Sequence, residues 1–210
     1  MILIGRNLSP FTRRVAISLH LLDMPFERRE LATATQVEEI RAYNPLARVP
    51  ALVLDDGEIL VDSSAILDHL DEVAGPDRRL TPAAGAARRT VNRLVAFALG
   101  AMEKGVTAYY ELNRRPADVQ WPEGAARADV QVRGGLDQLE AAAQAADTAS
   151  GGWLVGDRIG QADISAVVAL DFIRAVRPGL LADGELPALD ALARRCAALP
   201  AFAATVPQTP

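Results

Sequence analysis

The chain has 210 residues, of which 50% are hydrophobic and 23% charged, and its formal net charge is −5 at pH 7. This length and apolar content exclude a disordered or fibrous chain and suit one large domain or two modest ones. The acidic balance supplies no overall positive field for nucleic acid or an anionic membrane. No apolar run of about 18 residues predicts a membrane span. We therefore expect a soluble, cytoplasmic protein that binds neither nucleic acid nor membrane.

The few cysteines and histidines narrow the chemistry further. Cys196 is the single cysteine, which excludes an internal disulfide and a paired redox motif and favours a reducing compartment. His20 and His69 fall inside helical patterns, and no cluster of side chains has the spacing of a zinc site. No metal is expected, and any reactive group has to come from a bound partner molecule.

The first part of the chain alternates short apolar runs with helical patterns. Ser9-Pro10 is a helix start signal, because serine is a good N-cap and proline is tolerated at the first helical position. Asp55-Asp56-Gly57 is a hairpin turn signal between two short apolar runs. The order predicts a β-α-β unit, a helix and a ββα unit, with a mixed four-stranded sheet. The expected strands are 2–4, 26–31, 51–54 and 58–61, and the expected helices are 10–23, 37–43 and 64–74.

The rest of the chain predicts helices alone. Apolar residues recur at helical spacing in two long segments, and a third segment is apolar nearly all round, which is typical of a central buried helix. We expect helices over about 91–109, 125–146, 162–176 and 188–197. The expected organisation is an α/β domain over 1–76, a linker over 77–83 and an all-helical domain over 84–210.

Three short segments of the first domain carry chemistry-bearing residues. Ser9 lies between a strand end and a helix start, where free N–H groups and the helix dipole stabilise a thiolate or another anion. Val49-Pro50 enters a strand, and a cis proline there leaves the Val49 main chain free to pair with an extended peptide. Asp62-Ser63 again joins a strand to a helix, and the pair suits the ammonium and carboxylate groups of an α-amino acid. Each segment also has a structural interpretation, as a helix cap or an ordinary loop proline.

Taken together, the motifs SPFTRRV, NPLARVPAL and DDGEILVDSSAILDHLDE resemble the glutathione transferase family of the serine type. The resemblance covers the whole chain, with a thioredoxin-like first domain and an all-helical second domain. It implies glutathione as co-substrate, a hydrophobic electrophilic small molecule as the second substrate, and a homodimer.

The resemblance also implies a role for individual residues. Ser9 corresponds to the catalytic hydroxyl that donates a hydrogen bond to the thiolate. Val49, before the cis Pro50, pairs with the cysteinyl main chain. Asp62 and Ser63 hold the γ-glutamyl head. Arg48 lies where a basic or polar residue meets the glycyl carboxylate. Arg13 is either a source of positive potential at the site or, as we expect, an exposed residue of the first helix.

The second domain contributes two further expectations. The resemblance places the electrophile pocket beside its first long helix, and the candidate lining residues are Phe11, Met102, Tyr109 and Tyr110. Asp163 is expected to accept a hydrogen bond from the cap backbone of the central helix. Gly160 stands where the family usually has Ser or Thr, so half of this reciprocal capping pair is missing.

The activity that the resemblance implies is conjugation of the glutathione thiolate to an electrophile, as in cellular detoxification. A glutathione-dependent isomerase or peroxidase uses the same activated thiol, but the isomerase class usually has a Ser-Ser-Cys motif where this chain has Ser9-Pro10-Phe11. A non-catalytic binding protein on the same fold is the remaining alternative. The combined presence of Ser9, Asp62 and Ser63 argues against it.

Overall fold

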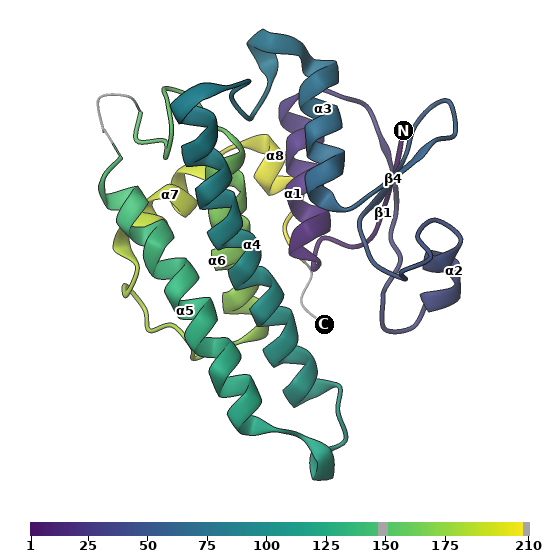
Figure 1. The fold of residues 1–210 in the computed structure, drawn as a ribbon, viewed down its shortest axis with the longest axis vertical. Helices are drawn as coiled ribbons and strands as arrows, with labels where there is room; N and C mark the ends of the chain where they lie inside the picture. The colour runs from purple at the N-terminus through teal and green to yellow at the C-terminus, as the bar shows by residue number, and fades with distance from the viewer. Residues whose placement is uncertain (147–150, 208–210) are drawn as a thin grey trace. The chain divides into compact units, whose positions relative to one another are not determined.

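The computed structural model describes residues 1–146 and 151–207. The chain divides into two compact units (Figure 1), the first combining Met1–Ala83 with the chain from Ala197 onward and the second formed by Ala84–Cys196. In this division the segment that begins at Ala197 groups with the α/β unit, whereas the sequence analysis placed it in the helical domain.

The first unit contains the predicted mixed four-stranded sheet. Its strands β1 (Ile2–Ile4), β2 (Glu27–Arg29), β3 (Ala51–Val53) and β4 (Ile59–Val61) lie in the order β2-β1-β3-β4. β1 is parallel to β2 and antiparallel to β3, and β3 is antiparallel to β4. No strand is longer than its predicted range, because each strand ends where its main chain stops pairing with the neighbouring strand.

Alternation along the strands assigns the sheet two buried faces. Leu3 pairs with Leu52 across β1 and β3, and neither side chain has exposed surface. Ile4 and Ala51, the next pair, lie on the opposite face and pack with Ile40 of the short helix α2 (Val37–Arg41). Helices therefore cover both faces of the central strand pair.

Helices α1 (Pro10–Leu21) and α3 (Ser63–Arg78) lie side by side on the sheet (Figure 1). The predicted end of α3 near residue 74 agrees with a kink at Gly75, whose φ is +78° and which precedes Pro76. The short helix α8 (Pro200–Ala203), which the sequence pattern did not predict, also belongs to this unit.

The second unit is built from helices α4 (Gly85–Asn113), α5 (Pro122–Gln144), α6 (Gln161–Val176) and α7 (Pro187–Ala197), with a 3-10 turn, η1, at Ala117–Val119. α6 is the central buried helix that the sequence predicts, since thirteen of its sixteen residues are buried. Glu140 of α5 accepts hydrogen bonds from the main-chain N–H groups of Ala188 and Leu189, so a buried carboxylate fixes the start of α7.

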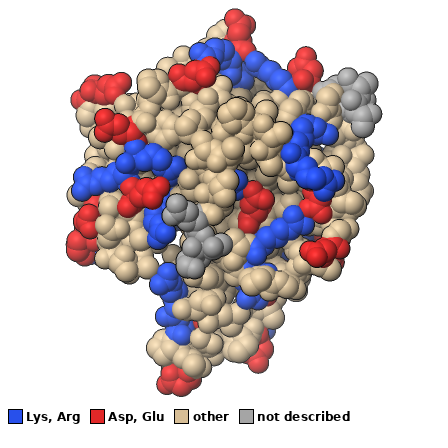
Figure 2. Space-filling model, turned by 180° about the vertical axis from the view of Figure 1, so that it is seen from behind, with Lys and Arg blue, Asp and Glu red and all other residues tan. Residues whose placement is uncertain are grey.

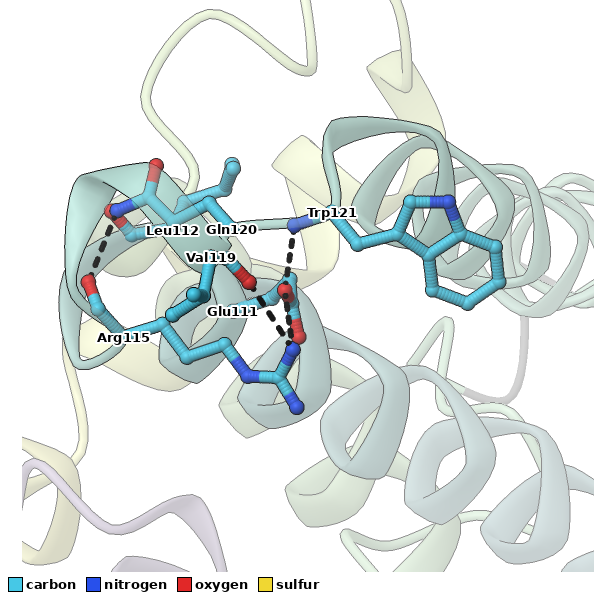
Figure 3. Close-up of polar contacts among 6 residues, drawn as sticks. All are labelled: Glu111, Leu112, Arg115, Val119, Gln120 and Trp121. Carbon is cyan, nitrogen blue, oxygen red and sulfur yellow. Dashed lines mark hydrogen bonds and ion pairs between the residues drawn. The ribbon is translucent and has the colours of Figure 1, made fainter.

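The connection between α4 and α5 is held by side-chain contacts to the main chain (Figure 3). Glu111 accepts a hydrogen bond from the Trp121 N–H at 2.6 Å and forms an ion pair with Arg115 at 3.3 Å. Arg115 donates to the Val119 carbonyl at 3.2 Å, and the Gln120 amide donates to the Arg115 carbonyl at 3.1 Å. These contacts turn the chain between two helices that pack along their length.

The start of α6 contains half of a reciprocal capping pair, as expected. The Asp163 carboxylate accepts hydrogen bonds from the N–H groups of Gly160 at 2.9 Å and Leu154 at 2.8 Å. Gly160 has no side chain with which to cap Asp163 in return. Asp163 has no exposed surface, and this burial raises its pKa to about 6 in spite of the two N–H donors.

No helix in the described part of the chain combines the length and the apolar character that crossing a bilayer requires. Acidic and basic side chains are interspersed over the face drawn in Figure 2. This distribution agrees with the small net charge of −5.

We predict that Asp163 makes folding stability fall as the pH rises. Its pKa is higher in the folded chain than in an unfolded one, so its contribution is present below about pH 4 and is lost through about pH 6. Relative to Asp163→Asn, the wild-type free energy of unfolding should fall by about 2 kcal/mol between about pH 4.5 and about pH 7.5. Urea unfolding at a series of pH values measures this difference. The exposed Asp157→Asn is the matched control, and a flat or rising difference for Asp163→Asn would contradict the assignment.

Candidate active site

Ser9 caps the first helix of the α/β unit, as the sequence predicts. Its main chain is extended, and its Oγ accepts a hydrogen bond from the Thr12 N–H at 3.3 Å. Pro10 has no N–H, so Phe11 provides the remaining N–H donor among the first three residues of α1. The hydroxyl proton of Ser9 has no acceptor among the described residues. The start of α1 thus presents a hydroxyl donor and an N–H donor beside the positive end of a helix dipole.

Gly5 brings three parts of this site together. Its φ is +122°, and a Cβ atom at this position would lie 2.6 Å from Thr12 Oγ1 and 2.9 Å from Val49 Cβ. The end of β1, the first turn of α1 and the segment before β3 therefore approach each other too closely for any side chain at residue 5. This contact places Val49 beside the helix start that Ser9 caps.

An arginine of β2 braces the loop between β1 and α1. Arg28 donates hydrogen bonds to Asn7 Oδ1 at 2.6 Å and to the Gly5 carbonyl at 3.0 Å. Burial lowers its pKa below the ordinary value for arginine, and the charge of Glu30 opposes this effect. Hydrogen bonds from β2 therefore fix the loop that carries Ser9.

The Val49-Pro50 peptide bond is cis, as the family resemblance implies. Asn44, which is 3% exposed, fixes the preceding loop by accepting from the Leu46 N–H at 3.0 Å and donating to the Arg48 carbonyl at 2.9 Å. Within residues 1–146 and 151–207, neither the N–H nor the carbonyl of Val49 has a hydrogen-bond partner. Both groups are therefore available to an extended ligand. The Arg48 side chain is exposed.

The N-cap of α3 is Asp62 rather than Ser63, which is the first helical residue. Asp62 Oδ1 accepts from the Ser64 N–H at 2.7 Å, and the exposed carboxylate keeps its second oxygen for another donor. Its φ of +72° is unusual for a residue other than glycine and costs about 1–3 kcal/mol. Strain of this kind clusters at binding sites because folding alone does not favour it.

A buried arginine of α1 contacts Ser63. Arg14, which is 2% exposed, donates from Nη1 to Ser63 Oγ at 3.3 Å. Sequence reasoning missed this residue. One feature of the sequence indicates that Arg14 is buried. Val15 to Ile17, which follow it, are all apolar, so little of α1 is left to expose a charged side chain.

Arg13 corrects an expectation, because it is 4% exposed rather than solvated. Its Nε donates to the Thr205 carbonyl at 3.0 Å, and its guanidinium lies 5.9 Å from the centre of the Phe202 ring. Arg13 therefore ties the C-terminal segment to α1. This contact also accounts for the inclusion of that segment in the first unit.

The candidate pocket residues differ in exposure. Phe11 and Tyr109 are half-buried, Tyr110 is 46% exposed and Met102 has no exposed surface. Phe11 belongs to the first unit and the other three to the second. Their role in an electrophile pocket stays a prediction. No cluster of potential metal ligands occurs in the portion of the chain that the structure describes.

Comparison with known proteins identifies the family. A model described as the glutathione S-transferase N-terminal domain matches residues 3–78, and one described as its C-terminal domain matches residues 120–200. Maleylacetoacetate isomerase of Pseudomonas aeruginosa is 30% identical over 212 residues, covering 98% of this chain and 96% of that protein. The chain belongs to the glutathione S-transferase family.

Two further family members extend this result. The GST-like protein YibF of Escherichia coli is 28% identical over 185 residues, which cover 87% of this chain and 88% of that protein. A glutathione S-transferase of Methylobacterium radiotolerans, solved in complex with glutathione sulfonate, matches the fold with a TM-score of 0.90 at 28% identity. This match covers 100% of this chain and 95% of that one.

We predict that Gly5→Ala strongly destabilises the first unit. The new Cβ would meet Thr12 and Val49 and would also hold alanine at a positive φ, at a combined cost of about 3 kcal/mol. Gly57→Ala is the matched control, because its φ is also positive at +91° but no atom lies within 4 Å of the added Cβ. Chemical unfolding measures both variants. Equal losses would show that the close contact at Gly5 contributes nothing.

Proposed function

We propose that this chain binds glutathione in its first unit and catalyses attack of the glutathione thiolate on an electrophilic small molecule. The observation that carries the proposal is the start of α1, where the Ser9 hydroxyl proton and the Phe11 N–H have no acceptor among the described residues. A free thiol has a pKa of about 8.5, and a helix N-terminus with a hydroxyl donor lowers it towards neutrality. The thiolate is the reactive form of the sulfur.

The peptide main chain of glutathione is proposed to pair with Val49. Its free N–H and carbonyl groups follow a loop that Asn44 holds in place, and they suit an extended peptide. Because Gly5 keeps Val49 beside the first turn of α1, a cysteinyl residue paired there has its sulfur near Ser9. Arg48, whose side chain is exposed, is the proposed partner of the glycyl carboxylate.

The γ-glutamyl head is proposed to bind at the start of α3. The free oxygen of Asp62 accepts from the ammonium group, and Ser63 with the nearby N–H groups donates to the α-carboxylate. The glutathione sulfonate complex of the Methylobacterium radiotolerans relative supports a ligand of this class.

Catalysis then requires the enzyme to orient the thiolate and to keep it ionised. The sulfur lone pair forms a bond to the electrophilic carbon, and in a substitution the leaving group departs with the electron pair of its bond. In an addition, the electrons move into the conjugated acceptor, which then takes up a proton. The Ser9 hydroxyl remains a hydrogen-bond donor in both cases, and it stabilises the anion without forming a covalent bond.

An isomerase is the second candidate, because a relative at 30% identity over nearly the full chain is a maleylacetoacetate isomerase. In such a reaction, the thiolate adds to a cis double bond and leaves again after rotation, so glutathione is not consumed. Incubation with a cis-enedione acid and measurement of the remaining thiol separates the two. Product formation at constant thiol supports the isomerase, and matched loss of thiol supports conjugation. The homodimer and the cytoplasmic location stay predictions.

We predict that Ser9→Ala keeps glutathione binding and loses turnover. Loss of a charge-assisted hydrogen bond to the thiolate should lower kcat with chlorodinitrobenzene by about 10- to 100-fold and raise the pKa of the bound thiol. Ultraviolet absorbance of the thiolate and steady-state kinetics measure the two effects. Ser64→Ala, at an exposed serine of α3, is the control. Full turnover in Ser9→Ala would remove Ser9 from the mechanism.

A further inference from the structure

Arg14 is a buried cation without a carboxylate partner. Its side chain is 2% exposed, and its Nε has no hydrogen-bond partner. No carboxylate of the described residues lies within ion-pair distance of it. An unpaired buried charge is unfavourable for folding, so Arg14 at this position is expected to serve a further role.

Among the described residues, the Arg14 side chain makes one hydrogen bond, and its chemistry fixes which partner donates. A guanidinium group only donates, so Ser63 Oγ is the acceptor in the 3.3 Å contact. The hydroxyl proton of Ser63 must then point to a different acceptor, and the described residues supply none. Ser63 is thereby held as a donor towards a group outside the chain.

The positive charge of Arg14 favours an anionic ligand group at Ser63, as the hydrogen bond does. Burial lowers the pKa of Arg14 to about 10, and the nearby Asp62 charge opposes that effect, so the side chain stays cationic at neutral pH. A ligand cation at Ser63 would meet both a hydroxyl proton and a buried positive charge. A ligand carboxylate meets a donor and an attractive charge.

Asp62 and Ser63 are adjacent, yet they present opposite polarity. Asp62 carries a free carboxylate oxygen at the surface, whereas Ser63 is buried against Arg14. An α-amino acid head with a single orientation satisfies both. In the reverse orientation, the ligand carboxylate would meet Asp62 and the ligand ammonium group would meet the charge of Arg14.

We propose that Arg14 is a positioning residue that fixes Ser63 as a donor and makes this end of the site selective for the α-carboxylate of the γ-glutamyl head. This inference rests on the proposed binding of glutathione. Arg14 does not touch the ligand in this proposal, since it acts through Ser63 and through its charge.

The test compares glutathione with γ-aminobutyryl-cysteinylglycine, which lacks only the α-carboxylate. Calorimetry gives the ratio of the two dissociation constants for each protein. In the wild type we expect glutathione to bind about 10- to 100-fold more tightly. In Arg14→Met the ratio should fall to within about threefold, because the carboxylate has lost both its donor alignment and its attractive charge.

Two further variants separate positioning from simple loss of structure. Ile17→Ala removes another fully buried side chain of α1 and should lower the melting temperature while it keeps the wild-type ratio. Ser63→Ala keeps the Arg14 charge and should lose about tenfold of the discrimination, which gives a result even if Arg14→Met does not fold.

The outcomes distinguish the two proposals. A wild-type ratio in Arg14→Met or in Ser63→Ala overturns the role of Arg14 while leaving glutathione binding intact. Equal reduction of the ratio in Ile17→Ala also overturns it, since general loosening of α1 would then explain the effect. A wild-type protein that binds neither peptide overturns the proposed function together with this inference.

Discussion

The close approach at Gly5 is the constraint on which the rest of the site depends. A single residue without a side chain allows the end of β1, the first turn of α1 and Val49 to meet within van der Waals distance. Because of this contact, a helix start and a free strand-like main chain face the same small region. Arg28 and Asn44 then hold the two loops that lead to it. A tripeptide thiol needs this combination, since its main chain and its sulfur have to be bound at once.

Buried charge gives the site its polarity. The unpaired guanidinium of Arg14 is unfavourable for folding, and the large apolar contact of α1 offsets it, since Val15, Ile17 and Leu19 have no exposed surface. The positive φ of Asp62 is likewise unfavourable for folding. Asp62 is the N-cap of α3 and Arg14 of α1 contacts Ser63 in its first turn, so a negative and a positive group lie next to each other there. The fold thus retains two locally unfavourable elements at the place where ligand recognition is proposed.

Local sequence signals predicted much of this structure, and long-range contacts account for the misses. Ser9-Pro10, the hairpin turn and the apolar periodicity predicted the mixed four-stranded sheet, the capped α1 and the central α6, because these signals lie in neighbouring residues. Arg13 was expected at the surface, but its partner Thr205 lies 192 residues away. Arg14 contacts Ser63, which lies 49 residues further along the chain, and no local sequence pattern predicts a contact over that separation. The cap of α3 shifted by one residue because Asp62, at a positive φ, reaches the Ser64 N–H.

A crystal structure of the chain with bound glutathione tests the central claim most directly. The account predicts the sulfur within hydrogen-bond distance of Ser9 Oγ and the cysteinyl main chain paired with Val49. It also predicts the α-carboxylate on Ser63 and the ammonium group on Asp62. A sulfur remote from Ser9, or a γ-glutamyl head bound in the reverse orientation, would contradict it.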